Sequence, residues 1–293
     1  MSAPEMRPDL PRVGLMARLL RRPETRWGLP RHGLLARLLR GPVRRAVSPW
    51  LQGRLARAGR EVQHWRLGRL RLRIDPGVFP PGPTLSSAMF VRWLLSPDGP
   101  GPWPGRRVLD MGCGSGVIGL ALAEAGAQVL ASDINPGAVA NAAANAQANG
   151  LQLTVVLADL LAGIQTSALD CVLITPPYYP RTPRSMPERA WFCGQGFEYF
   201  HALFPQLAAL DLGRTEVLMI VSEDCDEEGI RHVARAHGLD LQLRGAGQAW
   251  LEWNAFLRVV PASQESAGPF PNFLDPSEGP GPARQVREHE GIR

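Results

Sequence analysis

The sequence predicts an α/β fold built on a mostly parallel, seven-stranded sheet with helices on both faces. From residue 106 onwards, short apolar runs typical of strands alternate with longer segments typical of helices. A glycine-rich turn follows the first of these strands at 112–116. The last two strand-like segments, 241–247 and 252–260, follow one another without a helix between them, which predicts a closing antiparallel pair.

Each element can be assigned from its pattern of apolar residues. Residues 61–75 alternate well enough for a hairpin or two short strands, and 76–87 then form a loop before an apolar helix at 87–95. The remaining strands are expected at 106–112, 127–133, 153–159, 169–177 and 216–223. The helices between them are expected at 116–126, 136–150 and 198–210, the first two ended by Gly126 and Gly150.

The charge divides the chain of 293 residues into three regions. The net charge is +5, yet residues 1–75 carry 18 arginines against five acidic residues, and no lysine occurs anywhere. We therefore predict an arginine-rich extension at 1–60, a folded domain at 61–260 and a Pro/Gly/Ser-rich disordered tail at 261–293. The extension repeats "LPRVGLMARLLRRP" as "LPRHGLLARLLRGP", which indicates either an RNA- or phosphate-binding arm or a partly disordered duplicated tail.

Composition excludes several classes of protein. No apolar run is long enough to span a bilayer, and the N-terminal region lacks the continuous apolar stretch of a secretory signal, so a cytoplasmic location is expected. The four cysteines form no CxxC pair and no histidine completes a zinc site, which predicts reduced thiols and no metal. The sequence does not indicate an oligomeric state.

The glycine-rich turn "VLDMGCGSGVIG" predicts a ligand-binding loop at the start of a helix. Its glycines let the backbone turn tightly and approach a ligand. Gly114, Gly116 and Gly119 also satisfy the GxGxxG pattern of dinucleotide-binding proteins, so the turn by itself leaves a nicotinamide-dependent oxidoreductase open.

Three carboxylates at successive strand ends indicate which kind of ligand the glycine-rich turn binds. Asp110, Asp133 and Asp159 end the first three strands of the parallel sheet, on the side where such sheets bind ligands. A carboxylate at Asp110 suits a cationic ligand better than a pyrophosphate, although Asp110 could instead hold the glycine loop through backbone N–H groups. Asp133 is placed to accept from ribose hydroxyls, and Asp159 from an adenine amino group.

Taken together, "VLDMGCGSG", "SDINPGAVANAAANAQANG", "ADLL" and "TPPYY" resemble class I S-adenosylmethionine-dependent methyltransferases. The resemblance covers roughly residues 61–260 and implies a Rossmann-like doubly wound fold with S-adenosylmethionine as cofactor. The most similar group carries an Asn-Pro-Pro-Tyr motif after the fourth strand and includes release-factor glutamine methyltransferases and RNA base methyltransferases. The cofactor-binding residues that the resemblance implies are Asp110, Gly112, Gly114, Asp133, Ile134, Asp159 and Leu160.

The resemblance also implies a role for the stiff corner "TPPYY". In that group the residue before the prolines and the first proline carbonyl each accept one N–H of the acceptor's amino or amide group, and the aromatic residue stacks on the acceptor. The catalytic residues implied here are Thr175, Pro176 and Tyr178, with Pro177 and Tyr179 beside the acceptor. Phe79 and Pro80 occupy the position of the substrate-gating segment, where they either wall the acceptor pocket or pack the loop.

Thr175 departs from the motif, which has Asn or Asp at this position. A hydroxyl still accepts one hydrogen bond, but it does not match the glutamine-selective Asn. We therefore expect methyl transfer to an amino or amide nitrogen, with RNA or protein as the favoured acceptor. The alternative is a non-catalytic RNA-binding protein on the same scaffold. Residues 180–200, rich in Arg and aromatic side chains, are expected to form a lid.

Overall fold

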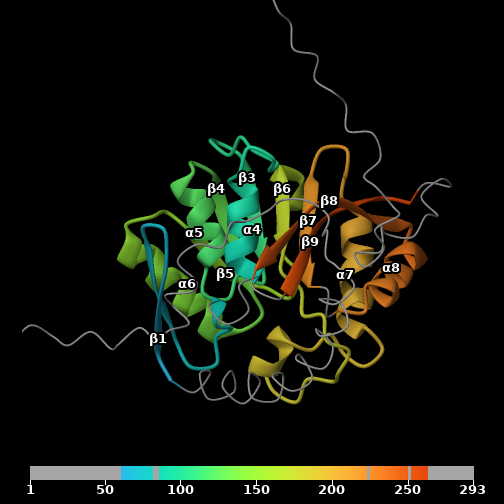
Figure 1. Ribbon diagram of the computed structural model, residues 1–293, viewed down its shortest axis with the longest axis horizontal. Helices are drawn as coiled ribbons and strands as arrows, with labels where there is room; N and C mark the ends of the chain where they lie inside the picture. Colours follow the sequence, from blue (N-terminus) through green and yellow to red (C-terminus); the bar gives the residue numbers. More distant parts are fainter. Residues whose placement is uncertain (1–60, 82–85, 223–224, 250–251, 263–293) are drawn as a thin grey trace, which may run out of the picture.

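A computed structural model of the chain describes residues 61–81, 86–222, 225–249 and 252–262. Its main element is a seven-stranded sheet with the order β5-β4-β3-β6-β7-β9-β8, accompanied by the two-stranded sheet β1-β2 (Figure 1). The strands are Gln63–Leu67 (β1), Leu70–Ile74 (β2), Arg107–Met111 (β3), Gln128–Asp133 (β4), Thr154–Leu157 (β5), Cys171–Ile174 (β6), Glu216–Ser222 (β7), Leu239–Ala249 (β8) and Glu252–Pro261 (β9).

The strands from β3 to β7 are parallel, and β9 joins them antiparallel between β7 and β8. The chain leaves β3 towards β4 on one side and returns to β6 on the other, so β3 lies at the switch point of the sheet, where open parallel sheets bind ligands. The Rossmann-like fold and the closing antiparallel pair predicted from the sequence are confirmed.

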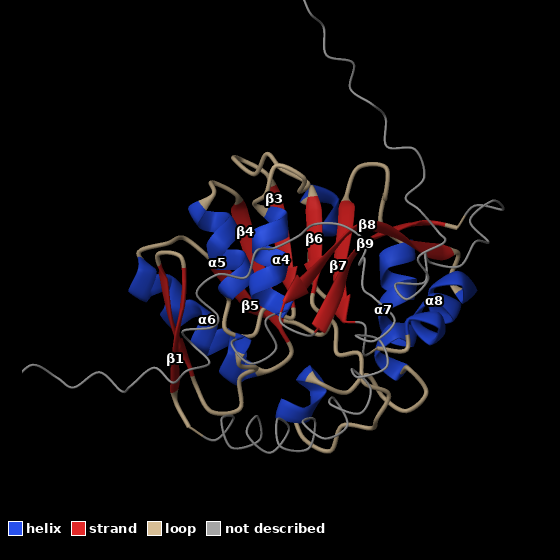
Figure 2. Ribbon diagram, viewed as in Figure 1, coloured by secondary structure: helices blue, strands red, loops and turns tan. Residues whose placement is uncertain are grey.

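Helices cover both faces of the sheet (Figure 2). They are Ser86–Leu94 (α4), Val117–Glu124 (α5), Pro136–Asn149 (α6), Glu198–Ala208 (α7) and Glu227–Ala236 (α8). Neighbouring residues of one strand point to opposite faces. Val108 therefore packs with α4, α5 and α6, whereas Leu109 packs with α7 and α8. Burial on both faces explains why the central strands are apolar throughout.

Helix α8 has no counterpart among the helices expected from the sequence. No element was expected for residues 226–236, where Glu227, Glu228, Arg231 and Arg235 make the segment mostly charged. Only the apolar spacing of Ile230, Val233 and Ala234 marks the buried side of the helix.

The β1–β2 hairpin is attached to α6 by a row of asparagines. Asn145 accepts from the Arg73 N–H at 2.9 Å and donates to the Arg73 carbonyl at 2.9 Å, and Asn149 does the same for Arg71 at 2.9 and 2.8 Å. Residues four apart lie on one side of a helix. The asparagines therefore occupy the free edge of β2 much as a further strand would.

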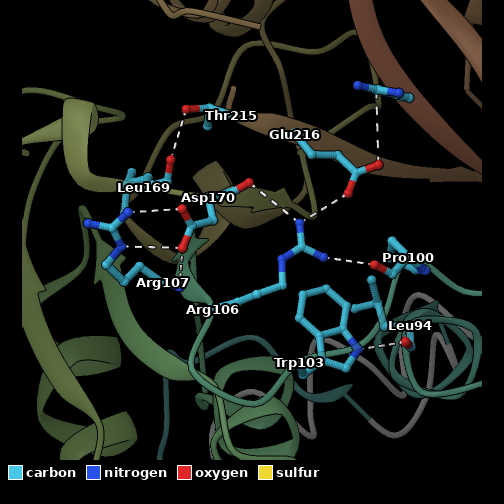
Figure 3. A network of polar contacts seen from close by, with 10 residues as sticks. Leu94, Pro100, Trp103, Arg106, Arg107, Leu169, Asp170, Thr215 and Glu216 are labelled. Atoms are coloured by element: carbon cyan, nitrogen blue, oxygen red, sulfur yellow. Dashed lines mark hydrogen bonds and ion pairs between the residues drawn. The ribbon is translucent and has the colours of Figure 1, made fainter. Parts of the chain in front are cut away.

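A polar network ties together the amino ends of β3, β6 and β7, at the end of the sheet opposite the glycine loop (Figure 3). Arg107 binds Asp170 through two guanidinium contacts, of 3.0 and 3.2 Å, and through its own backbone N–H at 2.8 Å. Arg106 donates to Glu216 at 3.2 Å and lies over the ring of Trp103 at 4.8 Å.

The predicted extension at 1–60 and tail at 261–293 fall outside the described residues, apart from 261 and 262, so the three-part division of the chain stays a prediction. Among the described helices, none is long and apolar enough to cross a membrane.

Candidate active site

A cavity of about 510 Å³ opens at the carboxyl ends of β3, β4, β5 and β6. It is lined by the glycine loop after β3, the turns after β4 and β5, the corner after β6, and residues of the loops before α4 and before α7. In Figure 1 the yellow segment after β6 lies beyond this end of the sheet. All predicted site residues except Asp110 and Pro80 line the cavity.

The glycine loop is held in a left-handed turn against β4. Gly112, Gly114 and Gly116 have φ of 74°, 54° and 81°, values that side chains disfavour. The N–H groups of Gly112 and Cys113 donate to the Ser132 carbonyl at 2.8 and 2.9 Å. A Cβ on Gly116 would lie 3.0 Å from the Ala142 Cβ, so this glycine also permits the close approach of α6.

Asp110 is buried beneath this loop and does not line the cavity. Its Oδ2 accepts from the Gly119 N–H at 2.8 Å, in the first turn of α5. Burial raises the pKa of the Asp110 carboxyl to about 7. The geometry supports the structural alternative, in which Asp110 fixes the start of α5.

Asp133 ends β4 at the cavity wall and is the carboxylate that organises the site. Its oxygens accept from the Gly114 N–H at 2.9 Å and the Asn135 N–H at 2.8 Å. Burial raises the pKa of Asp133. Because each carboxylate oxygen has two lone pairs, Asp133 retains capacity to accept two hydroxyl donors from a ligand.

Asp159 and Leu160 line the cavity from the turn after β5, and Ile134 lines it from the turn after β4. Leu160 has φ of 54°, a left-handed conformation that costs a leucine about 1–2 kcal/mol. Strain of this kind is concentrated at functional sites.

The corner after β6 contains a buried polar atom without a partner among the described residues. Thr175 lines the cavity, and its Oγ1 is buried with no hydrogen-bond partner among the described residues. Pro176 and Pro177 follow it, and the rings of Tyr178 and Tyr179 lie 4.9 Å apart. Tyr179 forms an isolated bridge with Phe192, which fixes the following loop to the corner.

Two loops far apart in the sequence meet beside this corner. Phe79, before α4, contacts Trp191, from the segment predicted as a lid, with ring centroids 4.6 Å apart. Both line the cavity, together with Phe192 and Arg189. Pro80 is buried and packs the loop, whereas Pro81 lines the cavity instead.

Sequence reasoning missed Asn135 and Tyr199. Asn135 accepts from the Gly137 N–H at 2.9 Å as the cap of α6, and its Nδ2 donates to the Gly77 carbonyl at 3.1 Å. The Asn-Pro pair at a helix start was the available signal for the cap. Tyr199, near the start of α7, also lines the cavity, and burial raises its pKa.

Among the described residues, no group of three or more His, Cys, Asp or Glu side chains is arranged to hold a metal ion. The cysteines Cys113, Cys171, Cys193 and Cys225 are free thiols.

Comparison with known proteins shows that the segment around this cavity is similar to methyltransferases. The sequence model of the methyltransferase small domain matches residues 69–186. The ribosomal protein L11 methyltransferase of Xanthomonas euvesicatoria pv. vesicatoria is 39% identical over 117 residues, 36% of this chain and 38% of that protein. The ribosomal RNA small subunit methyltransferase C of Hahella chejuensis is 37% identical over 121 residues, 41% of this chain and 34% of that protein.

The chain thus spans little more than a third of the length of these relatives. Among solved structures, the 16S rRNA N2 G1207 methyltransferase of T. thermophilus, in complex with AdoMet and guanosine, has a TM-score of 0.48 at 19% identity, over 67% of this chain and 50% of that one. Residues 69–186 thus match the methyltransferase small domain, which agrees with the resemblance to S-adenosylmethionine-dependent methyltransferases and gives no support to the oxidoreductase alternative.

Proposed function

We propose that this chain is an S-adenosylmethionine-dependent methyltransferase that acts on an amino or amide nitrogen of an RNA or protein acceptor, held at Thr175-Pro176-Pro177-Tyr178. The observation that carries the proposal is that Thr175, whose Oγ1 is buried without a partner, lines the same cavity as Asp133 and Asp159. A buried hydroxyl without a partner is costly, and a ligand N–H would satisfy it.

The residues at one side of the cavity fit the cofactor by their chemistry. Asp133 has capacity for the ribose hydroxyls, and Asp159 with the backbone of Leu160 would hold the adenine, against which Ile134 would pack. Gly112 and Gly114 carry no Cβ, so the methionine part can approach their backbone. When bound, the cofactor supplies an electrophilic methyl group on a positively charged sulfur.

The corner would hold and orient the acceptor nitrogen. Thr175 Oγ1 accepts one N–H and the Pro176 carbonyl accepts the other, which fixes the direction of the nitrogen lone pair. The prolines keep this carbonyl rigid and outside the sheet ladder. Such placement contributes up to about 7–11 kcal/mol in the most favourable cases.

The aromatic side chains favour a flat acceptor. Tyr178 lines the cavity beside the corner, and Phe79 and Trp191 wall the same cavity from two other loops. Stacking of one base on an aromatic ring contributes about 1–3 kcal/mol.

The test separates cofactor binding from transfer. Calorimetry with S-adenosylmethionine should show binding that D133A weakens at least tenfold and T175V leaves within about twofold. Methyl-labelled cofactor should then label the RNA or the protein fraction of an extract from cells lacking this gene. T175V and Y178A should each lower that labelling at least tenfold, and R214A, at an exposed site outside the cavity, should leave it unchanged.

One competing function follows from Thr175 standing where the motif has Asn. A non-catalytic RNA-binding protein would bind the cofactor without labelling any fraction, and T175V would then change nothing. That result would contradict the proposed transfer.

A further inference from the structure

The outward face of the β1–β2 hairpin is a stripe of basic side chains. Leu70, Leu72 and Ile74 of β2 are buried, and the residues between them are exposed. In the hairpin register Arg66 lies opposite Arg71, and His64 opposite Arg73. We call these four exposed residues, with Arg69 beside the turn, the arginine stripe.

Folding does not explain this arrangement. Like charges directly opposite one another on antiparallel strands destabilise the pair. Arg73 binds Asp75 at 2.9 Å, but within the described part of the chain no ion pair joins Arg66, Arg69 or Arg71 to a carboxylate. The neighbouring helix α6, "PGAVANAAANAQAN", contains no charged residue at all. Apart from Arg73, the arginines of the stripe therefore have no carboxylate partner among the residues that the structure describes.

The arginine stripe leads to the candidate active site. Three residues after β2, Gly77 lines the cavity and is tied by its carbonyl to Asn135, and Phe79 follows as part of the aromatic wall. In Figure 1 the open end of the blue hairpin lies at the same end of the molecule as the yellow segment after β6. A ligand bound along the stripe could thus place one unit in the cavity.

We infer that the arginine stripe binds the phosphate backbone of an RNA acceptor, one base of which enters the cavity. The inference rests on the proposed function, because it identifies the stripe's ligand with the acceptor. Arginines match phosphate oxygens with paired N–H donors. Residues that alternate along a strand present these donors about 7 Å apart, in a row that can follow an extended backbone. A membrane surface fits less well, because the stripe contains no apolar side chain to insert.

The test uses the full chain and a fluorescein-labelled, single-stranded 16-nucleotide RNA of mixed sequence, without cofactor. Fluorescence anisotropy should show R66E/R71E binding this RNA at least tenfold more weakly than the unchanged protein at 100 mM salt. Each lost phosphate contact lowers the slope of log affinity against log salt by about 0.7 for single strands. The slope should therefore become shallower by about 1.4.

A matched control is R92E/R214E, which changes the net charge equally at two exposed arginines outside the stripe. Both variants retain the arginine-rich residues 1–60. An equal loss in the control, or no loss in R66E/R71E, would overturn the inference. So would loss of binding to phosphatidylserine vesicles with RNA affinity unchanged.

A second variant distinguishes ligand binding from a structural role. R66A/R71A removes a repulsive cross-strand pair, so it should unfold at equal or higher denaturant concentration and still bind the RNA at least fivefold more weakly. Parallel loss of stability and affinity would indicate that the arginines act through folding and would overturn the inference.

The two proposals can fail separately. If a protein is labelled and RNA affinity is unchanged in R66E/R71E, RNA binding by the arginine stripe is contradicted, while the proposed methyl transfer still stands. Absence of cofactor binding in the unchanged protein, with RNA affinity lost in R66E/R71E, would overturn the methyl transfer and leave the RNA-binding surface.

Discussion

At the scale of single residues, the glycines and carboxylates near the cavity have different tasks although the sequence presents them alike. Asp133 lines the cavity, while Asp110 lies beneath it and holds Gly119. Two features require glycine at position 116: its φ of 81° disfavours a side chain, and an added Cβ would lie too close to Ala142. The strand ends therefore combine ligand-facing groups with groups that shape the loop.

The variants G116A and G68A separate the effect of a positive φ from the effect of close packing. Gly68 has φ of 56°, but no atom lies within 4 Å of the position that an added methyl group would take, so G68A should cost about 1–2 kcal/mol for its backbone alone. G116A adds overpacking against Ala142, worth about 1–3 kcal/mol more. Urea unfolding of both variants measures the difference, and equal losses would contradict the packing argument.

Asp110 should make stability depend on pH. Its pKa in the folded protein is raised to about 7, so between about pH 4 and pH 7 the folded state holds a proton that the unfolded state has lost. Stability from this group is present below pH 4 and falls as pH rises to 7. D110N keeps an acceptor for Gly119 and should show a smaller fall in urea midpoint from pH 5 to pH 8. D98N, at an exposed carboxylate, should behave like the unchanged protein.

At the scale of elements, the hairpin depends on α6 for its position. Asn141, Asn145 and Asn149 direct their amides at the β2 backbone, where a strand would otherwise pair. Asn145 also donates to the Ser115 carbonyl at 3.0 Å, which connects the hairpin to the glycine loop. The asparagine row thus links the arginine stripe to the cavity.

Replacing the asparagines should reveal this dependence. N145A leaves the part-buried Arg73 N–H and the buried Ser115 carbonyl without partners, whereas the Arg73 carbonyl keeps its hydrogen bond from Asn141, and each lost partner costs about 1–3 kcal/mol. N149A should cost less, because its contacts with Arg71 are exposed and water can replace the amide. Hydrogen exchange of the β2 amides should rise more in N145A than in N149A; the reverse order would contradict a buried link.

At the scale of the whole molecule, the two ends of the sheet are specialised. The carboxyl ends carry the cavity and its loops, while the amino ends are joined by Arg106, Arg107, Asp170 and Glu216 (Figure 3). Parallel strands place all their carboxyl ends at one edge of the sheet. The cavity residues and the polar network are therefore separated by the length of the strands.

The polar network at the amino ends of β3, β6 and β7 should become less stabilising in acid. Hydrogen bonds from Arg107 lower the pKa of Asp170 to about 2, so the contribution of this carboxylate is complete above about pH 4 and is lost as pH falls towards 2. D170N should therefore be less stable than the unchanged protein at pH 7, and the difference should be much smaller at pH 2. Denaturant unfolding at both values measures this, and a constant difference would show that charge is not involved.

The sequence by itself determined the alternation of strands and helices, the glycine loop, the acidic strand ends and the Pro-Pro-Tyr corner. These are local signals, since periodicity, turn-forming residues and strand termini are encoded within short segments. The confirmed hairpin at 61–75 and helix at 136–150 belong to this class.

Only the tertiary structure decided which of these groups meet. The contact of Phe79 with Trp191 and the insertion of β9 between β7 and β8 join segments distant in the chain. The outward alignment of Arg66 and Arg71 depends on the hairpin register. Such pairings are selected by packing and register across the whole fold, and no short stretch of sequence contains that information.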